Sequence, residues 1–196
     1  FTNAIFYWET AAPAGQYPVT FLATDKDGSD QETITITVIE KPRLLLSEIA
    51  DPAGDGADAY RFVELYNAGS GPIDLAVENW SLSRQVNGGD WDDIALTGTV
   101  TEARTWVVAN SSADFETAYG IAPDQESSAI GGNGDDAWIL FYGGDHNTGI
   151  LIDIYGEIDT DGTDTAWDYE DSRAVRKRSV SQPNTKWTST EWAIVD

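Results

Sequence analysis

The sequence predicts an all-β protein, in which a β-sandwich follows a smaller β module. Two observations favour this class. Short runs of alternating apolar and polar residues recur along the chain, and this is the period of a half-buried strand. Clusters of Gly, Asn and Asp such as Gly131-Gly132-Asn133-Gly134 separate these runs, as is typical of sandwiches and barrels. No long amphipathic helical pattern occurs, so a mixed α/β core is not expected.

Three strands are predicted near the start of the chain, at 5–9, 17–23 and 33–38. In the second and third strands apolar side chains occupy every other position, with threonines opposite them in the third. Asp25–Gln31 would connect these two strands as a hairpin. Three strands are too few for a stable sandwich. The segment is therefore either the end of a module that begins upstream or a set of strands that docks on the rest of the chain.

A linker is predicted at Glu40-Lys41-Pro42-Arg43, because Pro42 cannot donate to a strand ladder and biases Lys41 toward extended structure. We place the domain boundary here, with residues 1–42 in the first domain and 43–196 in the second. After a strand that opens at Leu44, the second domain has predicted strands at Tyr60–Asn67, Trp80–Val86, Ile94–Thr97, Thr105–Ala109, Ala137–Tyr142, Ile150–Tyr155 and Ala174–Val180.

One short helix is predicted after Ser111. The Ser111 side chain can cap it, Asp114 follows three residues on, and Gly120 stands where a C-terminal glycine belongs. Two helical turns would lie between these residues.

Two family resemblances accompany these patterns. Phe6-Tyr7-Trp8-Glu9, with the stretches 14–21, 23–29 and 32–38, resembles the last strands of bacterial immunoglobulin-like or cadherin-like repeats. Such repeats act as stalks and spacers in surface or secreted proteins. The resemblance therefore implies that residues 1–42 are the C-terminal strands of such a module.

The second domain resembles the lamin tail domain, an immunoglobulin-like sandwich, in the form found in secreted bacterial proteins. This resemblance rests on Ser47-Glu48-Ile49, Phe62–Asn67, Asp74-Leu75, Trp80-Ser81-Leu82, Phe115 with Tyr119-Gly120, Gly134–Leu140 and Ile152–Gly156. The closing stretch is similar to the versions attached to extracellular nucleases, through Asp161-Gly162-Thr163, Ala166-Trp167, Arg173–Lys177 and Glu191-Trp192. It implies a non-catalytic, extracellular accessory module for spacing, docking or targeting. Its partners would be other domains of the parent protein or an extracellular ligand.

Composition narrows the classes of activity. The 11 Lys and Arg against 34 Asp and Glu give a net charge of −23, so direct nucleic-acid binding is not expected. No apolar run is long enough for a membrane span. The chain has no Cys, which excludes thiolate zinc sites and thiol catalysis. The single His146 lies in a turn sequence, so a catalytic triad is not expected and the chain is predicted not to be an enzyme.

Two Asp-rich segments are candidate calcium sites, and calcium is the cofactor that they would take. The first contains Asp159, Asp161 and Asp164, and the second contains Asp25, Asp27 and Asp30. Alternating carboxylates around a glycine turn can supply several of the oxygen ligands that calcium needs. The other interpretation is a turn that uses Asp and Gly for backbone reasons. Calcium sites would favour a second function, a calcium-dependent adhesion or ligand-binding module.

Candidate partner-binding residues are Arg173, Arg176, Lys177 and Arg178. On a predicted strand, Arg176 and Arg178 would face one side and Lys177 the other. The alternatives are a charged edge strand or ion pairs inside the acidic body. Trp91, in a predicted exposed loop at 88–93, is a candidate ligand contact.

Two glutamates and several tryptophans complete the candidates. Glu48 and Glu64 form either a carboxylate site or ion pairs with an Arg such as Arg61 or Arg173. Trp80, Trp106 and Trp138 are predicted core residues because they lie within strand patterns.

Overall fold

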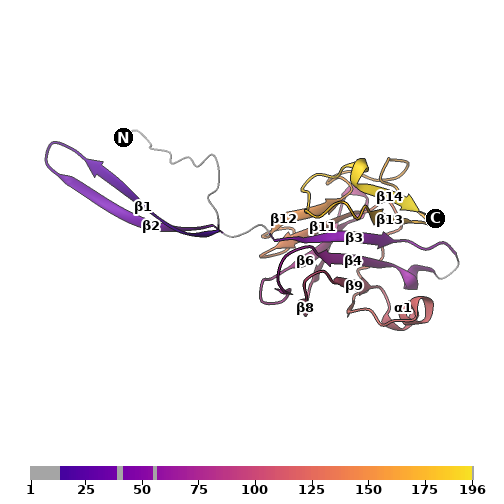
Figure 1. Ribbon diagram of the computed structural model, residues 1–196. Coiled ribbons are helices and arrows are strands. Elements are labelled where there is room, and N and C mark those ends of the chain that lie inside the picture. Colours follow the sequence, from indigo (N-terminus) through magenta and orange to yellow (C-terminus); the bar gives the residue numbers. More distant parts are fainter. Residues whose placement is uncertain (1–13, 39–41, 55–56, 196) are drawn as a thin grey trace. The chain divides into compact units, whose positions relative to one another are not determined.

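The computed structural model describes residues 14–38, 42–54 and 57–195. The chain divides into two compact units, Phe1–Pro42 and Arg43–Asp196, and the boundary lies in the predicted linker (Figure 1). The strand predicted at 5–9 lies outside the described residues.

The described part of the first unit is the predicted hairpin. β1 (Gly15–Thr24) pairs antiparallel with β2 (Ser29–Val38), and Tyr17 lies opposite Ile36. The turn between them is held by Asp25, whose Oδ1 accepts the backbone N–H groups of Asp27 and Gly28 at 2.8 and 3.0 Å. These bonds let β2 begin at Ser29, earlier than the alternation of residues indicates.

The second unit is a β-sandwich, so the predicted all-β class is correct. The larger sheet has the order β10-β9-β4-β3-β13-β14 and the smaller sheet the order β12-β11-β6-β7. The larger sheet contains β3 (Leu44–Ala50), β4 (Phe62–Asn67), β9 (Thr105–Ala109), β10 (Gln125–Glu126), β13 (Arg173–Arg176) and β14 (Trp192–Val195). The smaller sheet contains β6 (Ser81–Gln85), β7 (Trp91–Ala95), β11 (Ala137–Tyr142) and β12 (Ile150–Tyr155), and β5 (Ile73–Asp74) pairs separately with β8 (Thr99–Val100).

The core fills the space between the two sheets. Alternate residues of β3 and β4, including Leu44, Leu46 and Leu65, point into it and are fully buried. Trp80 and Trp138 are 1% exposed, as predicted, whereas Trp106 is only partly buried. This packing leaves the opposite face of the larger sheet directed outward.

The single described α-helix covers one end of that outer face. α1 (Ser112–Tyr119) is capped by Ser111, and Gly120 ends it in the left-handed conformation at φ 74°. Both caps are as predicted. Phe115 packs edge-on against Phe62 of β4 with ring centroids 5.4 Å apart.

Three local predictions are wrong. β13 ends at Arg176 rather than Val180, because the chain turns there and Val180 N–H donates to the Lys177 carbonyl at 2.9 Å. β7 runs from Trp91 to Ala95 rather than from Ile94 to Thr97, so Trp91 lies in a strand and not in a loop. Tyr60 belongs to a short 3₁₀ turn (Ala57–Tyr60) before β4.

Candidate functional site

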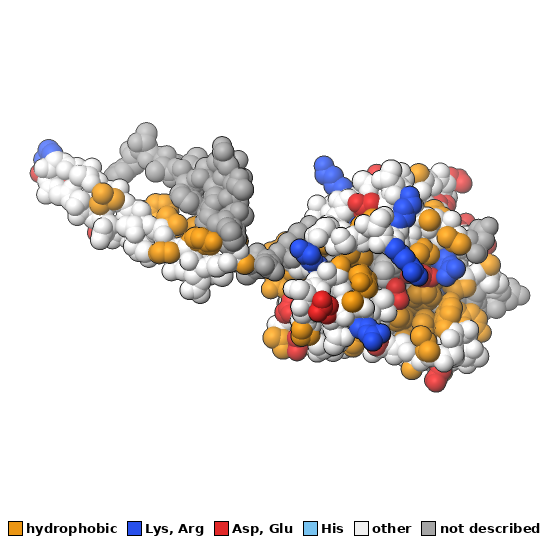
Figure 2. Space-filling view, in the orientation of Figure 1, with side chains coloured by type: hydrophobic (Ala, Val, Ile, Leu, Met, Phe, Trp, Pro, Cys, Tyr) orange, Lys and Arg blue, Asp and Glu red, His pale blue; other side chains and the backbone are white. Residues whose placement is uncertain are grey.

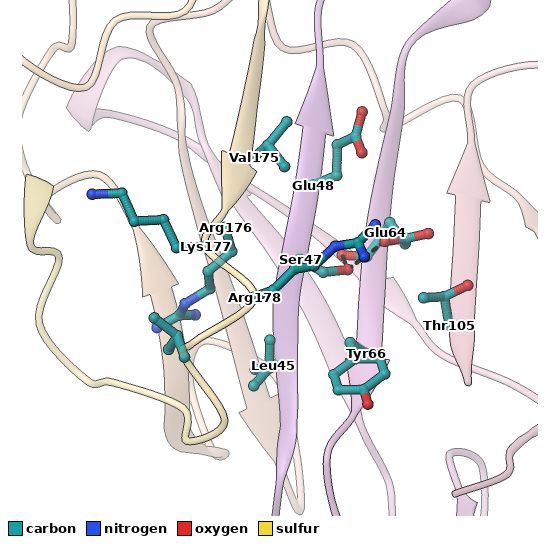
Figure 3. Close-up of a pocket in the computed structure, with 11 residues that line it drawn as sticks. Leu45, Ser47, Glu48, Glu64, Tyr66, Thr105, Val175, Arg176, Lys177 and Arg178 are labelled. Carbon is teal, nitrogen blue, oxygen red and sulfur yellow. Dashed lines mark hydrogen bonds between the residues drawn. The ribbon is translucent and has the colours of Figure 1, made fainter. Parts of the chain in front are cut away.

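A groove of about 680 Å³ opens on the outer face of the larger sheet, where β13 ends beside β3 (Figure 3). Leu45, Tyr66, Val175 and Val180 supply apolar surface to it. The early end of β13 therefore leaves part of the sheet face uncovered.

A β-bulge in β3 shapes the floor of the groove. Leu46 pairs with Leu65 and Glu48 pairs with Glu64, so Ser47 is an extra residue in β3. A bulge interrupts the strict alternation of side chains, and Ser47 and Glu48 consequently both line the groove although they are adjacent in the chain.

Glu64 is the half-buried acid of the groove. Ser47 Oγ donates to its Oε1 at 2.7 Å. Burial raises the pKa of the Glu64 carboxyl, and the neighbouring Glu48 carboxylate raises it further, against the opposing effect of the Ser47 hydrogen bond. The carboxyl is therefore more easily protonated than an exposed Glu.

Glu48 forms the predicted ion pair, with Arg173 Nη1 3.0 Å from its Oε1. The other predicted partner, Arg61, instead pairs with Asp51 at 2.6 Å. Glu48 and Glu64 lie opposite each other on β3 and β4. Glu48 is paired with the Arg173 cation, whereas Glu64 is bonded to the Ser47 hydroxyl. This favours the ion-pair interpretation for Glu48 and leaves Glu64 as the acid that faces the groove.

Lys177 and Arg178 line the groove and are exposed. Lys177 Nζ donates to the Thr190 carbonyl at 2.7 Å. Arg178 has no carboxylate partner among the described residues, and Figure 3 shows its side chain extending across β3 toward Glu64. The groove thus combines apolar side chains and the acids Glu48 and Glu64 with cations that can contact a ligand.

Arg176 does not join Lys177 and Arg178 at the groove surface. It was predicted to bind a partner, and its burial corrects this prediction. It is 5% exposed, and its guanidinium pairs with Asp153 of β12 and with Glu191. Arg176, the last residue of β13, points between the sheets. Its charge therefore neutralises carboxylates of the fold and does not face a partner. Lys177 and Arg178, in the turn that follows, do not alternate as strand residues would.

Six cations of the sandwich are exposed among the described residues. They are Arg43, Arg104, Arg173, Lys177, Arg178 and Lys186. Figure 2 shows blue side chains spread over one face of the molecule.

The two Asp-rich segments use their carboxylates in turns. Asp161 Oδ1 accepts the Thr163 N–H and hydroxyl at 3.0 and 2.8 Å, and these bonds lower its pKa. Asp159 exchanges hydrogen bonds with the Gln85 amide, and Asp164 N–H donates to Asp168.

Asp25 caps its own hairpin turn, as described above. In the same hairpin Asp27 pairs with Lys26, and Asp30 Oδ1 accepts the Gln31 N–H. Across the described residues, no group of three or more His, Cys, Asp or Glu side chains is arranged to hold a metal ion. Calcium binding stays a prediction.

Trp91 and His146 form a stacked pair, with ring centroids 4.9 Å apart and parallel planes. His146 Nδ1 lies 2.6 Å from Asp93 Oδ2, and Ser83 Oγ donates to the other oxygen of the same carboxylate at 2.6 Å. The serine hydroxyl is bound to the aspartate and not to the imidazole, so the order of contacts differs from that of a hydrolytic triad. Trp91 is half-buried by this packing, which reduces the surface that it offers a ligand.

Sequence reasoning identified the two acids Glu48 and Glu64 as one candidate site and the cations Lys177 and Arg178 as part of another, and did not bring the two groups together. The groove depends on the bulge at Ser47 and on the end of β13, and neither has a distinctive residue pattern. No family model and no curated protein matches the chain. No helix in the described ranges is long and apolar enough to cross a membrane.

Proposed function

We propose that the chain is a non-catalytic binding module of a secreted or cell-surface multi-domain protein, and that the groove on the outer face of the larger sheet is its docking surface. The observation that carries this proposal is the groove itself, where the exposed Lys177 and Arg178 stand beside apolar side chains in a chain of charge −23. In this proposal the second domain is lamin-tail-like. The β-sandwich fold of the second unit is compatible with that assignment.

The chemistry of the groove favours an acidic peptide segment with aliphatic side chains as the occupant. Val175 and Val180, which are half-buried, offer apolar contact, and Lys177 and Arg178 offer charge-assisted hydrogen bonds to carboxylates. A long polyanion is disfavoured because it would extend beyond Lys177 and Arg178 and be repelled by a chain of charge −23. The partner would be another domain of the parent protein or a separate extracellular protein.

Selection from a displayed library of short random peptides tests this proposal. Peptides enriched on the wild-type protein are expected to pair acidic with aliphatic residues and to bind less tightly as salt rises. The double variant Lys177→Glu/Arg178→Glu should lose this binding. Its matched control, Lys26→Glu/Lys186→Glu, changes the net charge equally at exposed positions outside the groove and should retain binding.

Two results would overturn the proposal. One is a selection in which both double variants retain the same peptides as the wild type. The other is hydrolysis of DNA, RNA or peptide substrates by the purified chain, which would replace the non-catalytic assignment.

A further inference from the structure

A second hollow, of about 350 Å³, lies on the outer face of the larger sheet at the end that carries α1 (Figure 1). Figure 2 shows hydrophobic side chains gathered at this end. Tyr119 and Val195 line the hollow and are 43% and 38% exposed. The Tyr119 ring packs edge-on against Phe62, with ring centroids 5.3 Å apart. A ligand can therefore reach large apolar side chains in this hollow.

The strand register places this hollow and the groove in one line along the outer face. Paired residues of neighbouring strands form rows, and side chains of the same face recur at every second residue of a strand. The row in the second hollow is Val195, Arg173, Ala50 and Phe62. The next row is Val175, Glu48 and Glu64 (Figure 3). The row beyond it, in the groove, is Leu45 and Tyr66. Glu48 lines both hollows, so the two are continuous.

A ligand that spans both hollows has a defined length. Phe62 and Tyr66 lie four residues apart on β4, which is a distance of about 13 Å at the rise of a strand. An extended peptide covers the same distance in four residues and turns every second side chain toward the sheet. Its residues i, i+2 and i+4 would face the groove, the middle row and the second hollow in turn.

The charges along this line differ between its two ends. Lys177 and Arg178 are exposed at the groove, and the Arg173 side chain is 51% exposed against 20% for its partner Glu48. An acidic residue is therefore favoured at the groove. Asp171 is exposed and lines the second hollow, so an uncharged side chain is favoured there.

We propose that one extended peptide occupies both hollows, with an acidic residue beside Lys177 and Arg178 and a large apolar side chain, four residues away, against Tyr119. This inference rests on the proposed docking function and specifies its ligand. The residue midway would contact Val175, for which an aliphatic side chain is suited. Phenylalanine suits the second hollow, because aromatic rings gain edge-to-face contacts in addition to the burial of apolar area.

The probe is the capped peptide Glu-Thr-Val-Thr-Phe, together with its reverse Phe-Thr-Val-Thr-Glu, since the rows allow either chain direction. The matched control for each exchanges phenylalanine with the threonine beside it, which keeps the composition but turns the ring away from the sheet. Binding is measured by calorimetric titration. In the direction that binds, the control should bind about tenfold more weakly, as expected for a ring that is no longer buried.

Neighbouring residues of β14 supply matched variants of the protein. Val195 lines the second hollow, whereas Ile194 is similarly exposed, at 43%, and lines another pocket. Val195→Ala should weaken the binding of the probe, and Ile194→Ala should leave it unchanged. Tyr119→Ala should reduce the preference for the probe over its control, because the two rings are then no longer in contact. The melting midpoint of each variant serves as the control for folding.

The results that would contradict the proposal have different consequences. Equal binding of the probe and its control, lost in Lys177→Glu/Arg178→Glu, would exclude the second anchor and leave the docking groove in place. Unchanged binding by both Val195→Ala and Tyr119→Ala would do the same, as would failure of both probes where the peptides selected from the library bind. Failure of the probes and of the selected peptides together would overturn the docking function itself.

Discussion

At the scale of single residues, the fold depends on one buried ionic cluster between the sheets. Asp153 is fully buried on β12 and accepts the backbone N–H groups of Leu46 and Asn184 at 2.8 and 2.7 Å. Arg176 brings the opposite charge from β13 and also contacts Glu191. A buried charge without such partners would be strongly destabilising. The cluster therefore ties the smaller sheet to the larger one at a defined position.

Asp153 predicts a specific pH dependence of stability. Burial raises its pKa from 3.8 to about 6, against the lowering effect of Arg176. Between these pH values the folded state holds a proton that the unfolded state has lost. The stabilising contribution is therefore fully present below pH 3.8 and is lost as pH rises to about 6, with a slope of at most about 1.4 kcal/mol per pH unit.

Urea unfolding of the wild type and of Asp153→Asn across this pH range checks the prediction. The free energy of unfolding of the wild type, relative to that of the variant, should fall as pH rises and then become constant. Parallel pH profiles for the two proteins would contradict the assignment to Asp153.

Residue-level roles were only partly predictable from sequence. The Glu48–Arg173 pair was one of two alternatives for Glu48, because opposite charges on neighbouring strands commonly pair. The burial of Arg176 was not predictable, since Arg176, Lys177 and Arg178 are chemically alike and adjacent. Only the end of β13, set by the turn at Lys177–Val180, decides that one of them points inward and the others outward.

At the scale of elements, the strands with long alternation and the helix with both caps were predictable. Thr105–Ala109, Ala137–Tyr142 and Ile150–Tyr155 form strands with the predicted bounds. The strands β5, β8 and β10 were not predictable, because each has only two residues and two residues cannot show an alternation of apolar and polar positions. The bulge at Ser47, on which the groove depends, likewise carries no turn residue that would reveal it.

Two glycines with positive φ predict different costs of substitution. Gly120 ends α1 at φ 74°, and an added Cβ would contact nothing within 4 Å. Gly134 has φ 103°, and an added Cβ would lie 2.3 Å from the backbone nitrogen of Glu170. Gly120→Ala should cost about 1 kcal/mol through backbone strain alone. Gly134→Ala should cost about 3 kcal/mol, because the backbone must also move.

Urea denaturation of the two alanine variants measures this difference in the free energy of unfolding. Because the substitution is the same and both glycines have positive φ, the excess cost at Gly134 reports the backbone contact. Equal losses would contradict the close approach of these two segments.

At the scale of the whole molecule, the sandwich has a core of its own. Both buried apolar clusters draw their residues from the span between Leu44 and Trp192. The described hairpin of the first unit, by contrast, leaves Phe21 and Ile34 44% and 42% exposed. Because the core of the sandwich takes its residues from the second unit alone, we expect this unit to fold without residues 1–42.

Deletion of residues 1–42 tests this division. The truncated chain should fold and keep its melting midpoint within about 2 °C, which corresponds to less than about 1 kcal/mol for a domain of this size. Circular dichroism and calorimetry of the two chains provide the comparison. A large loss of midpoint, or failure of the truncated chain to fold, would show that the sandwich depends on the first unit.

The net charge of −23 predicts that salt stabilises the protein. Carboxylates far in excess of cations repel one another in the compact state, and dissolved ions screen that repulsion. We expect the melting midpoint to rise with sodium chloride, by about 2–4 °C for each kcal/mol of repulsion removed. A midpoint that does not change with salt would contradict this role of the charge.

The same melts separate screening from calcium binding when calcium and EDTA samples are compared at matched ionic strength. A calcium site in the folded state raises the melting midpoint by mass action, beyond the effect of salt. Asp161→Asn would then remove this extra rise if the ion binds in the segment of Asp161, and Asp27→Asn would remove it if the ion binds in the hairpin turn. The Asp161 carboxylate already accepts a turn N–H group, so Asp161→Asn also weakens its turn without calcium, whereas among the described residues the Asp27 carboxylate pairs only with Lys26. Only a loss that requires calcium therefore assigns a site and favours the calcium-dependent adhesion function. Equal midpoints in calcium and sodium would instead leave the Asp-rich segments as hydrogen-bonded turns on a protein stabilised by screening.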